Sequence, residues 1–401
     1  MSVPVETVPA PSDVPAPDPS GPARDGQLAE SLPGRYYLDP DQLVQDREHV
    51  FGRSWLAVLR SDELAPGSFA RVDLAGQDTI LVRDRAGVVR AFANLCRHRG
   101  ATLCTEDSGE LRRALRCVYH AWTYALDGSL LATPNAHEMP DLDRSRFGLV
   151  AFPTTEWLGY VWASADLDVA PLGDQVRPQL ESRLGDASVL DRYGIERLRL
   201  GHRQVYEVAS NWKCIVENFM ECYHCATIHP ELTAALPQFA SGWGTVSGGV
   251  GAGATFAEAL EGFALSGGRQ RDRLPGLTDA DDRLFHGVIL RPNVFLILVP
   301  DHVAFFRMEP VAHDHTRVTV DWLFDAAEVE RDDFDPGDSV GLLDVTNRQD
   351  FDACQRAQRG MSSPHYRGVL VPSEHIVLDF HDYYRRALGE GPPATAPPGS
   401  R

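Results

Sequence analysis

Residues 211–230 read NWKCIVENFMECYHCATIHP and form the most informative segment of the chain. The pattern predicts a helix that runs to about Ile228. On such a helix Glu217, Glu221 and His224 lie four and three residues apart, so they would share one face. An acidic helix face by itself is usually only solvated. The histidines that follow decide what this face is for.

The two histidines of this segment are spaced in a way that requires a break in the helix. His224 and His229 lie five residues apart, so a straight helix would not direct both imidazoles to one point. We expect the helix to end or bend between them, in agreement with Pro230. Two converging imidazoles and one carboxylate form a 2-His-1-carboxylate triad, which leaves open positions on Fe(II) for O₂.

A second constellation of possible metal ligands lies upstream. Cys96 and His98 give the pattern C-x-H, and Cys117 and His120 give C-x-x-H. Two thiolates and two imidazoles could hold a zinc ion, or a [2Fe-2S] cluster with two cysteines on one iron and two histidines on the other. The spacing alone does not separate the two.

The residues around these ligands separate them. CRHRGATL at 96–103 and CVYHAWTY at 117–124 resemble the Rieske domain of ring-hydroxylating and demethylating oxygenases. Val118 and Ala121 stand where that family usually has Pro and Gly. The resemblance implies that Cys96, His98, Cys117 and His120 hold a Rieske [2Fe-2S] cluster.

Residues 211–230 resemble the catalytic motif of the same family. The resemblance places Glu221 at the acidic position and makes His224 and His229 two ligands of a mononuclear iron. The third ligand comes from a late helix, which NRQDFDACQRAQRG at 347–360 matches, with Asp350 at the ligand position. Asp352 competes for this role, but on a helix it points about 200° away from Asp350.

The chain is predicted to have an α+β fold with two domains. Short strands between about residues 54 and 165, with turns such as Asp127-Gly128, indicate a small antiparallel β domain. The resemblance makes this the Rieske domain and implies a C-terminal catalytic domain of helix-grip type, an antiparallel sheet around a long helix. The predicted divisions are a disordered tail at 1–30, an N-terminal helix and Rieske domain at 36–165, linker helices at 166–195, the catalytic domain at 196–388 and a disordered tail at 389–401.

Individual elements are predicted as well. Asp39-Pro40 marks the start of a helix that ends near Phe51. In the catalytic domain the pattern favours strands at 203–209, 287–298, 302–308 and 317–324, and helices at 211–228 and 339–360.

Composition excludes several classes of function. The net charge of the 401 residues is −19, which argues against nucleic-acid binding, and no run of about 18 apolar residues predicts a membrane span. Residues 1–28 lack the basic start and apolar stretch of a signal peptide. Seven cysteines in a chain of this length do not indicate a secreted disulfide framework. We therefore expect a cytoplasmic protein.

The chain carries no convincing flavin or nicotinamide motif. Gly249, Gly251 and Gly253 lie in a glycine-rich stretch that lacks the β-α-β context of a dinucleotide site, so we expect a flexible loop there. The resemblance therefore implies a separate flavin or iron-sulfur reductase, with or without a ferredoxin. It also implies a homotrimer in which Glu221 bridges the iron site and a cluster histidine of the neighbouring subunit, His120 in preference to His98.

The sequence also suggests a class of substrate. Glu221 and the Cys-Tyr-His-Cys that follows it resemble the branch that acts on betaine- or carnitine-like quaternary ammonium compounds. Aromatic residues could supply a cation–π cage, although we expect at least three of the five to be core residues: Trp243, Phe256, Phe263, Phe285 and Phe295. The alternatives are hydroxylation or O-demethylation of an aromatic acid, and a Rieske protein that only transfers electrons, against which the triad argues.

Overall fold

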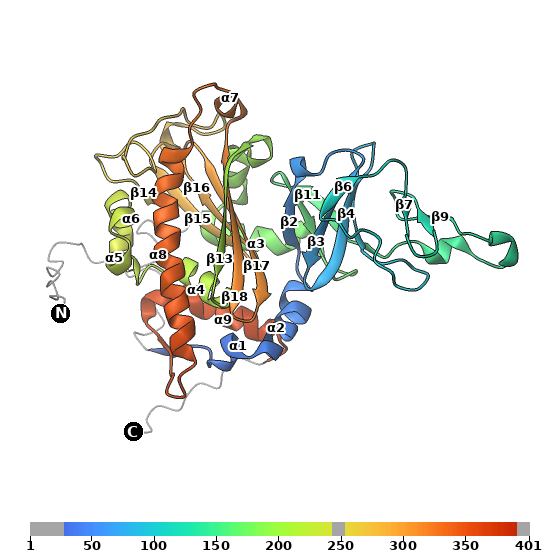
Figure 1. Ribbon diagram of the computed structural model, residues 1–401. Coiled ribbons are helices and arrows are strands. Elements are labelled where there is room, and N and C mark those ends of the chain that lie inside the picture. Colours follow the sequence, from blue (N-terminus) through green and yellow to red (C-terminus); the bar gives the residue numbers. More distant parts are fainter. Residues whose placement is uncertain (1–27, 243–252, 391–401) are drawn as a thin grey trace, which may run out of the picture.

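The computed structural model describes residues 28–242 and 253–390. A slender β lobe projects from a larger lobe in which helices pack on a sheet (Figure 1). Most of the two predicted tails, together with Trp243, Gly249 and Gly251, lies outside the described residues. At the margins of those tails, Ala29–Glu30 (β1) pair with Val369–Leu370 (β19), and Tyr36 donates a hydrogen bond to Glu390. These margins of the tails are ordered, contrary to the prediction.

The N-terminal helix begins where the sequence predicts. Asp39 caps α2 (Pro40–Asp46) by accepting a hydrogen bond from the Asp41 backbone, and Pro40 occupies the first helical turn. A short helix, α1 (Arg35–Leu38), precedes the cap, and a π-helical turn at Arg47–Phe51 follows α2.

The slender lobe consists of small antiparallel sheets. A tight turn at Asp127-Gly128 joins two of its strands, and Gly128 has a φ of +86° with the Phe92 ring packed where a Cβ would lie. The sheets have the orders β10-β5-β4-β3-β6, β11-β12-β2 and β7-β8-β9. Their strands are β2 (Leu56–Arg60), β3 (Ser68–Leu74), β4 (Gln77–Arg83), β5 (Val89–Ala93), β6 (Ser108–Glu110), β7 (Leu115–Arg116), β8 (Thr123–Tyr124), β9 (Leu130–Ala132), β10 (Ala151–Phe152), β11 (Thr154–Trp157) and β12 (Tyr160–Ala163).

The larger lobe is built on one antiparallel sheet of order β13-β18-β17-β16-β15-β14. The single strand predicted at 287–298 is wrong, because Arg291, Pro292 and Asn293 form a turn between two paired strands. The apolar residues on both sides of this turn concealed it. The strands are β13 (Arg199–Val208), β14 (Ala254–Thr255), β15 (Leu284–Leu290), β16 (Val294–Leu298), β17 (Val303–Ala312) and β18 (His315–Phe324).

Both faces of this sheet are buried, as the alternation along β17 shows. Ala304 and Phe306 pack into a core that includes side chains of α8, whereas Val303 and Phe305 pack into a core that includes α3. The helix α8 lies along the sheet for most of its height (Figure 1). The helices are α3 (Leu172–Leu184), α4 (Trp212–Met220), α5 (Cys225–Ile228), α6 (Pro230–Ala235), α7 (Ala326–Val329), α8 (Gly337–Met361) and α9 (His375–Ala387).

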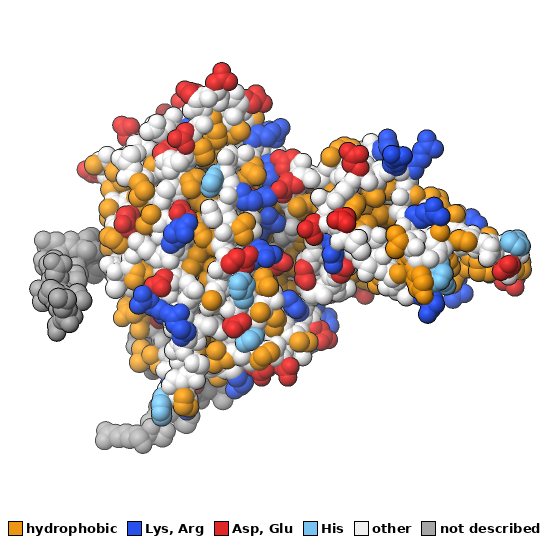
Figure 2. Space-filling model, viewed as in Figure 1, with side chains coloured by type: hydrophobic (Ala, Val, Ile, Leu, Met, Phe, Trp, Pro, Cys, Tyr) orange, Lys and Arg blue, Asp and Glu red, His pale blue; other side chains and the backbone are white. Residues whose placement is uncertain are grey.

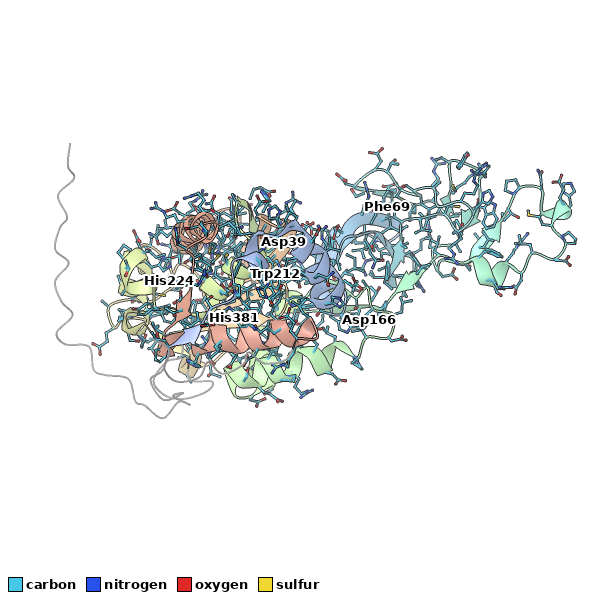
Figure 3. All side chains as sticks on the ribbon, turned by 90° about the horizontal axis from the view of Figure 1, so that it is seen from below. Asp39, Phe69, Asp166, Trp212, His224 and His381 are labelled. Carbon is cyan, nitrogen blue, oxygen red and sulfur yellow. The ribbon has the colours of Figure 1, made fainter. Side chains whose placement is uncertain are left out.

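A polar network joins the two lobes. Asp321 is fully buried on β18; it accepts a hydrogen bond of 2.7 Å from the Tyr160 hydroxyl and pairs with Arg203 at 2.5 Å. Arg203 also pairs with Glu63 of the slender lobe. Seen from below, Phe69 lies in the slender lobe, whereas Trp212 and His224 lie in the larger one (Figure 3). Within the described residues no helix is long and apolar enough to cross a membrane.

Candidate functional site: two metal centres

The helix expected at 211–228 is interrupted, and the prediction of its length is wrong. The Asn211 side chain caps α4 as its first turn begins, but the helix ends at Met220 and Glu221 is extended. The Glu221 carboxylate accepts hydrogen bonds from the backbone N–H groups of Tyr223 and His224. A side chain that binds nearby backbone in this way competes with the helix. Glu221 and His224 therefore do not share a helical face with Glu217.

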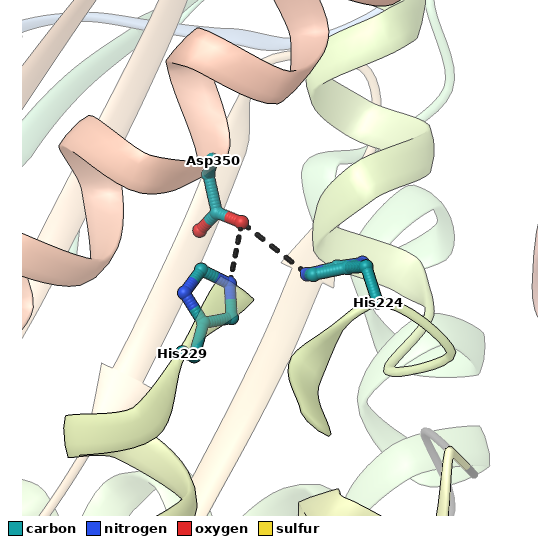
Figure 4. Close-up of side chains that lie close together, drawn as sticks. All are labelled: His224, His229 and Asp350. Atoms are coloured by element: carbon teal, nitrogen blue, oxygen red, sulfur yellow. Dashed lines mark hydrogen bonds and ion pairs between the residues drawn. The ribbon is translucent and has the colours of Figure 1, made fainter. Parts of the chain in front are cut away.

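The break places the two histidines at the ends of a single helical turn. His224 precedes α5 and His229 follows it, so the chain changes direction at both residues. Their Nε2 atoms lie 3.3 and 2.8 Å from one oxygen of Asp350, which α8 supplies (Figure 4). One candidate ligand atom from each of the three residues falls within 4.8 Å of the others. The structure thus brings together the three residues that the resemblance implied.

The outward nitrogens of both histidines are held by acceptors. Glu221 contacts Nδ1 of His224, and Gln349 Oε1 lies 2.7 Å from Nδ1 of His229. The Gln349 amide in turn donates to Glu231 at 3.1 Å. An acceptor at Nδ1 fixes the tautomer and leaves Nε2 to a metal. The sequence analysis missed Gln349 and Glu231, although each lies within two residues of a candidate ligand.

The electrostatics of the three residues favour a cation. Burial lowers the pKa of His224, but hydrogen bonds with Asp350 and Glu221 outweigh burial and raise it to about 10. Burial raises the pKa of Asp350, yet the two histidines hold it below its usual value. Two imidazoles and a buried carboxylate are a donor set that suits a mononuclear Fe(II).

Asp352, two residues after Asp350 on α8, does not face the two histidines. Asp352 is exposed and pairs with Arg356 at 2.7 Å, whereas Asp350 is 5% exposed and faces the histidines. This is the difference in direction that a two-residue step on a helix produces.

A cavity of about 420 Å³ opens beside the three residues. Phe256, Phe263, Phe285 and Phe295 are all buried, in agreement with the expectation that most of the candidate aromatics are core residues. Three of them also line the cavity, and Phe256 does not. Two further lining aromatics were not singled out from the sequence: Phe219 and Phe239.

The second set of candidate ligands lies in the slender lobe, on the loops that follow β5 and β7. Cys96 and Cys117 are buried, whereas His98 is exposed and His120 is half-buried. The His98 and His120 rings lie 4.6 Å apart. The Tyr124 hydroxyl lies 3.2 Å from the Cys96 sulfur.

These four residues fit a two-iron cluster better than one zinc ion. A tetrahedral zinc would hold its donor atoms within about 4 Å of one another. Within the described residues, however, only His224, His229 and Asp350 bring three candidate donor atoms within even 4.8 Å of one another. The His120 Nδ1 is buried without a hydrogen-bond partner in the described chain, as a free ligand atom would be. Cys104 lies nearby, and burial raises its pKa to about 11, which suits a packed thiol.

The two sites correspond to two matched family models. The model described as "Ring hydroxylating alpha subunit (catalytic domain)" matches residues 195–390, and "Rieske [2Fe-2S] domain" matches residues 54–147.

Similar proteins cover nearly the whole chain. The carnitine monooxygenase oxygenase subunit of Escherichia coli (strain K12) is 30% identical over 89% of this chain and 93% of its own length. The glycine betaine monooxygenase oxygenase subunit of Chromohalobacter salexigens is 29% identical over 93% of this chain and 89% of its own length. The crystal structure of the quaternary ammonium Rieske monooxygenase CntA in complex with L-carnitine aligns with a TM-score of 0.68 at 24% identity, covering 90% of this chain and 97% of that one.

Proposed function

This chain belongs to the family of Rieske-type ring-hydroxylating oxygenase alpha subunits, and we propose that it oxidises a quaternary ammonium compound of the carnitine or betaine type. It is an enzyme, a Rieske non-haem iron oxygenase, and its cofactors are a [2Fe-2S] cluster and a mononuclear iron. The observation that carries the proposed substrate class is the likeness to carnitine and glycine betaine oxygenase subunits through both lobes.

We assign the cluster to the four residues of the slender lobe. The buried thiolates of Cys96 and Cys117 would hold one iron, and the more exposed imidazoles of His98 and His120 would hold the other. Two neutral imidazoles in place of thiolates raise the reduction potential of such a cluster. The histidine side of the site faces outward, which suits electron transfer to and from another protein surface.

We assign the mononuclear iron to His224, His229 and Asp350. The iron, when bound, supplies O₂ activation with electrons from the cluster. The protein's own part is to orient the ligands: Glu221 and Gln349 hold Nδ1–H of the two histidines, so that both Nε2 atoms face Asp350. The phenylalanines of the cavity exclude water from this centre and leave space for a methyl-bearing ammonium group.

We propose that the two centres meet between subunits of a homotrimer. Within one chain, β7 and β9 of the slender lobe lie at the opposite end of the molecule from α5 (Figure 1). Val118 and Tyr119, beside the candidate cluster ligands, are 87% and 57% exposed, and Tyr223, beside Glu221, is 59% exposed. These three exposed apolar side chains suit an interface in which the slender lobe of one copy packs near Glu221 of the next.

The charge distribution supports the same arrangement. Basic side chains gather on the outer part of the slender lobe, whereas acidic and basic side chains are interspersed over the larger lobe (Figure 2). The exposed arginines around the cluster loops are Arg97, Arg99, Arg112, Arg113 and Arg116. On a chain with net charge −19, such a basic tip favours docking onto an acidic surface.

The electron source that we propose is a separate flavin or iron-sulfur reductase, with or without a ferredoxin. The seven cysteines of the chain form no disulfide, and all are buried. Free thiols of this kind support a reducing compartment, and we propose the cytoplasm.

The substrate proposal is tested by coupled turnover. The purified holoenzyme, with a surrogate reductase, NADH and O₂, would be assayed with carnitine, glycine betaine and a set of aromatic acids. We expect NADH consumption matched by an oxidised product only with the quaternary ammonium compounds, with formaldehyde released if the reaction is N-demethylation. Product formation from an aromatic acid and from no quaternary ammonium compound would transfer the assignment to aromatic hydroxylation or O-demethylation. A protein that reduces its cluster but forms no product from either class would point to electron transfer alone.

A further inference from the structure

The cavity beside the iron site has two chemically different parts. Along β15, Phe285, Gly287 and Ile289 alternate toward it, and Arg291 continues the same alternation beyond the strand end. Gly287 and Arg291 are thus about 13 Å apart along an extended chain. Arg291 extends the cavity lining from the phenylalanines into a charged region.

Arg291 is held on two sides by the fold. Gln179 of α3 accepts hydrogen bonds from the Arg291 backbone N–H at 2.8 Å and from its Nε at 3.2 Å. The guanidinium lies 4.4 Å from the ring centre of Tyr383 on α9. Neither α3 nor α9 carries a candidate iron ligand, so the cationic part of the cavity is built from elements other than those that form the iron site.

The guanidinium of Arg291 has no recorded counter-charge. Within residues 28–242 and 253–390 Arg291 forms no ion pair, and its hydrogen bonds use the backbone N–H and Nε rather than either Nη. Burial lowers the pKa of Arg291, although Tyr383 and Asp379 act in the opposite direction. A guanidinium remains charged after such a shift, so an anion that entered the cavity would be stabilised there.

A second arginine adds to the positive charge of the same cavity. Arg183 lies four residues after Gln179, one turn along α3 and on the same face, and its Nε donates to the Gly287 carbonyl at 2.7 Å. Asp379 and His375 of α9 also line the cavity; its remaining titratable lining groups are Glu221, Cys222 and Cys225, beside the three candidate iron ligands. Asp379 reduces the net charge of this region.

We propose that Arg291, aided by the charge of Arg183, binds a carboxylate of the substrate. For the quaternary ammonium class this inference rests on the proposed function and assigns the residues that bind the carboxylate of a zwitterion of the carnitine or betaine type. The planar guanidinium presents paired N–H donors that match the two oxygens of a carboxylate. A substrate that carries only a cation would be repelled by both arginines, and the phenylalanine-lined part would receive the methylammonium end of the zwitterion.

Matched ligand pairs test the carboxylate subsite. The probes are glycine betaine, carnitine and benzoate. Each is compared with the amide in which an uncharged carboxamide replaces the carboxylate. Binding to the oxidised holoenzyme is measured by calorimetry, without turnover, and KM and kcat are measured for every probe that reacts. For each probe that the wild-type enzyme binds, we expect the carboxylic acid to bind about 10- to 100-fold more tightly than its amide. This is the range that a charge-assisted hydrogen bond contributes.

Three substitutions separate the role of Arg291 from general damage. Arg291→Gln should remove the preference by weakening acid binding about 10- to 100-fold, with KM raised more than kcat is lowered and amide binding unchanged. Arg291→Lys keeps the charge and should retain part of the preference. Arg386→Gln is the matched control, because Arg386 is exposed, close enough to influence Arg291, and outside the cavity lining. It should behave as the wild type does.

The outcomes distinguish this inference from the proposed function. If benzoate binds with a preference that Arg291→Gln abolishes, and no quaternary ammonium compound binds, then the substrate class is wrong and the carboxylate subsite stands. The carboxylate subsite is overturned if wild-type enzyme binds amides as tightly as acids, if none of the acids binds, or if Arg291→Gln retains the preference. If Arg291→Gln does not fold, the same comparison is made with Arg291→Lys. The inference is then overturned if Arg291→Lys binds the acids as tightly as the wild type does and with the same preference for acid over amide.

Discussion

Single side chains in this protein owe their behaviour to the atoms that face them. Asp350 and Asp352 are the same chemical group two residues apart on α8, yet one is buried against two imidazoles and the other is paired with a surface arginine. Only the buried carboxylate can complete a metal site. Two histidines show the same contrast: Asp350 and Glu221 raise the pKa of His224, whereas burial lowers the pKa of His286.

The proposed iron ligands give the first prediction. Asp350→Ala removes the one carboxylate of the three, so we expect loss of the mononuclear iron and of turnover while the visible spectrum of the cluster is retained. Iron and acid-labile sulfide content, with turnover, measure this. Asp352→Ala is the matched control and should retain both. An active Asp350→Ala enzyme together with an inactive Asp352→Ala enzyme would contradict the assignment.

His286 predicts how stability depends on pH. Burial, with a contribution from Arg183, lowers its pKa to about 4. In the unfolded chain this pKa is near 6.5, so between these values the unfolded chain binds a proton that the folded chain does not, and stability falls as pH falls. From about pH 7.5 to about pH 5, His286 should account for a loss of roughly 2 kcal/mol.

Urea unfolding at the two pH values checks the role of His286. When the pH is lowered from about 7.5 to about 5, the free energy of unfolding should fall by roughly 2 kcal/mol less in His286→Gln than in the wild type. His137→Gln serves as the control, because His137 is exposed on a turn of the slender lobe. An equal loss in the wild type and in His286→Gln would exclude this origin of the pH dependence.

At the scale of elements, the breaks between helices are as important as the helices. α4 ends where Glu221 turns to bind nearby backbone, and the chain then makes one helical turn between His224 and His229. A continuous helix would have separated these imidazoles. The position of α4 is fixed at its N-terminal end by buried polar groups that tie it to α2 and α9.

This attachment predicts a large effect from one substitution. Lys213 and Asp46 are both 0% exposed and lie 2.5 Å apart, and Asp46 also accepts hydrogen bonds from Trp212 and Tyr384. Asp46→Asn leaves a buried ammonium group without its counter-charge, so we expect a loss of about 3–5 kcal/mol in the free energy of unfolding. Denaturant unfolding measures it, and Arg356→Ala, which removes an exposed pair, should cost no more than about 1 kcal/mol. Similar losses in the two variants would contradict this role.

The whole molecule has a shape that separates its two metal centres. The loops proposed to hold the cluster lie on a projecting lobe, and the proposed iron ligands lie in the larger lobe (Figure 1). Exposed apolar side chains lie beside each. A single copy offers no short route between these regions. An assembly that places the tip of one copy against Glu221 of another would supply that route, and Glu221 already contacts Nδ1 of His224.

Glu221 therefore gives a prediction that belongs to the assembly. Glu221→Gln should keep both metals, the oligomeric state and a reducible cluster, but electrons should reach the iron very slowly because the carboxylate bridge is lost. Stopped-flow oxidation of the pre-reduced cluster, with substrate and O₂ present, measures the step. Glu231→Gln is the control, because Glu231 reaches His229 only through Gln349. Rapid cluster oxidation in Glu221→Gln would rule the bridge out.

Features that depend on short spacings could be predicted from the sequence alone. Cys96 and His98, Cys117 and His120, and His224 and His229 each lie within a few residues of one another, so local spacing and resemblance were enough to propose them as metal ligands. The cap at Asp39 and the long helix with Asp350 are likewise local features, because periodicity and capping reside in neighbouring residues.

How distant segments meet depends on the packing of the whole chain. Asp350 lies 121 residues from His229 in the chain, and its distance from the imidazoles depends on how α8 packs on the sheet. Gln349, Glu231 and Arg291 carry no sequence pattern that marks them, because their roles arise from contacts across the fold. The helix break at Glu221 was missed because a side chain's hydrogen bonds to nearby backbone outweighed helical propensity, a competition that periodicity does not reveal.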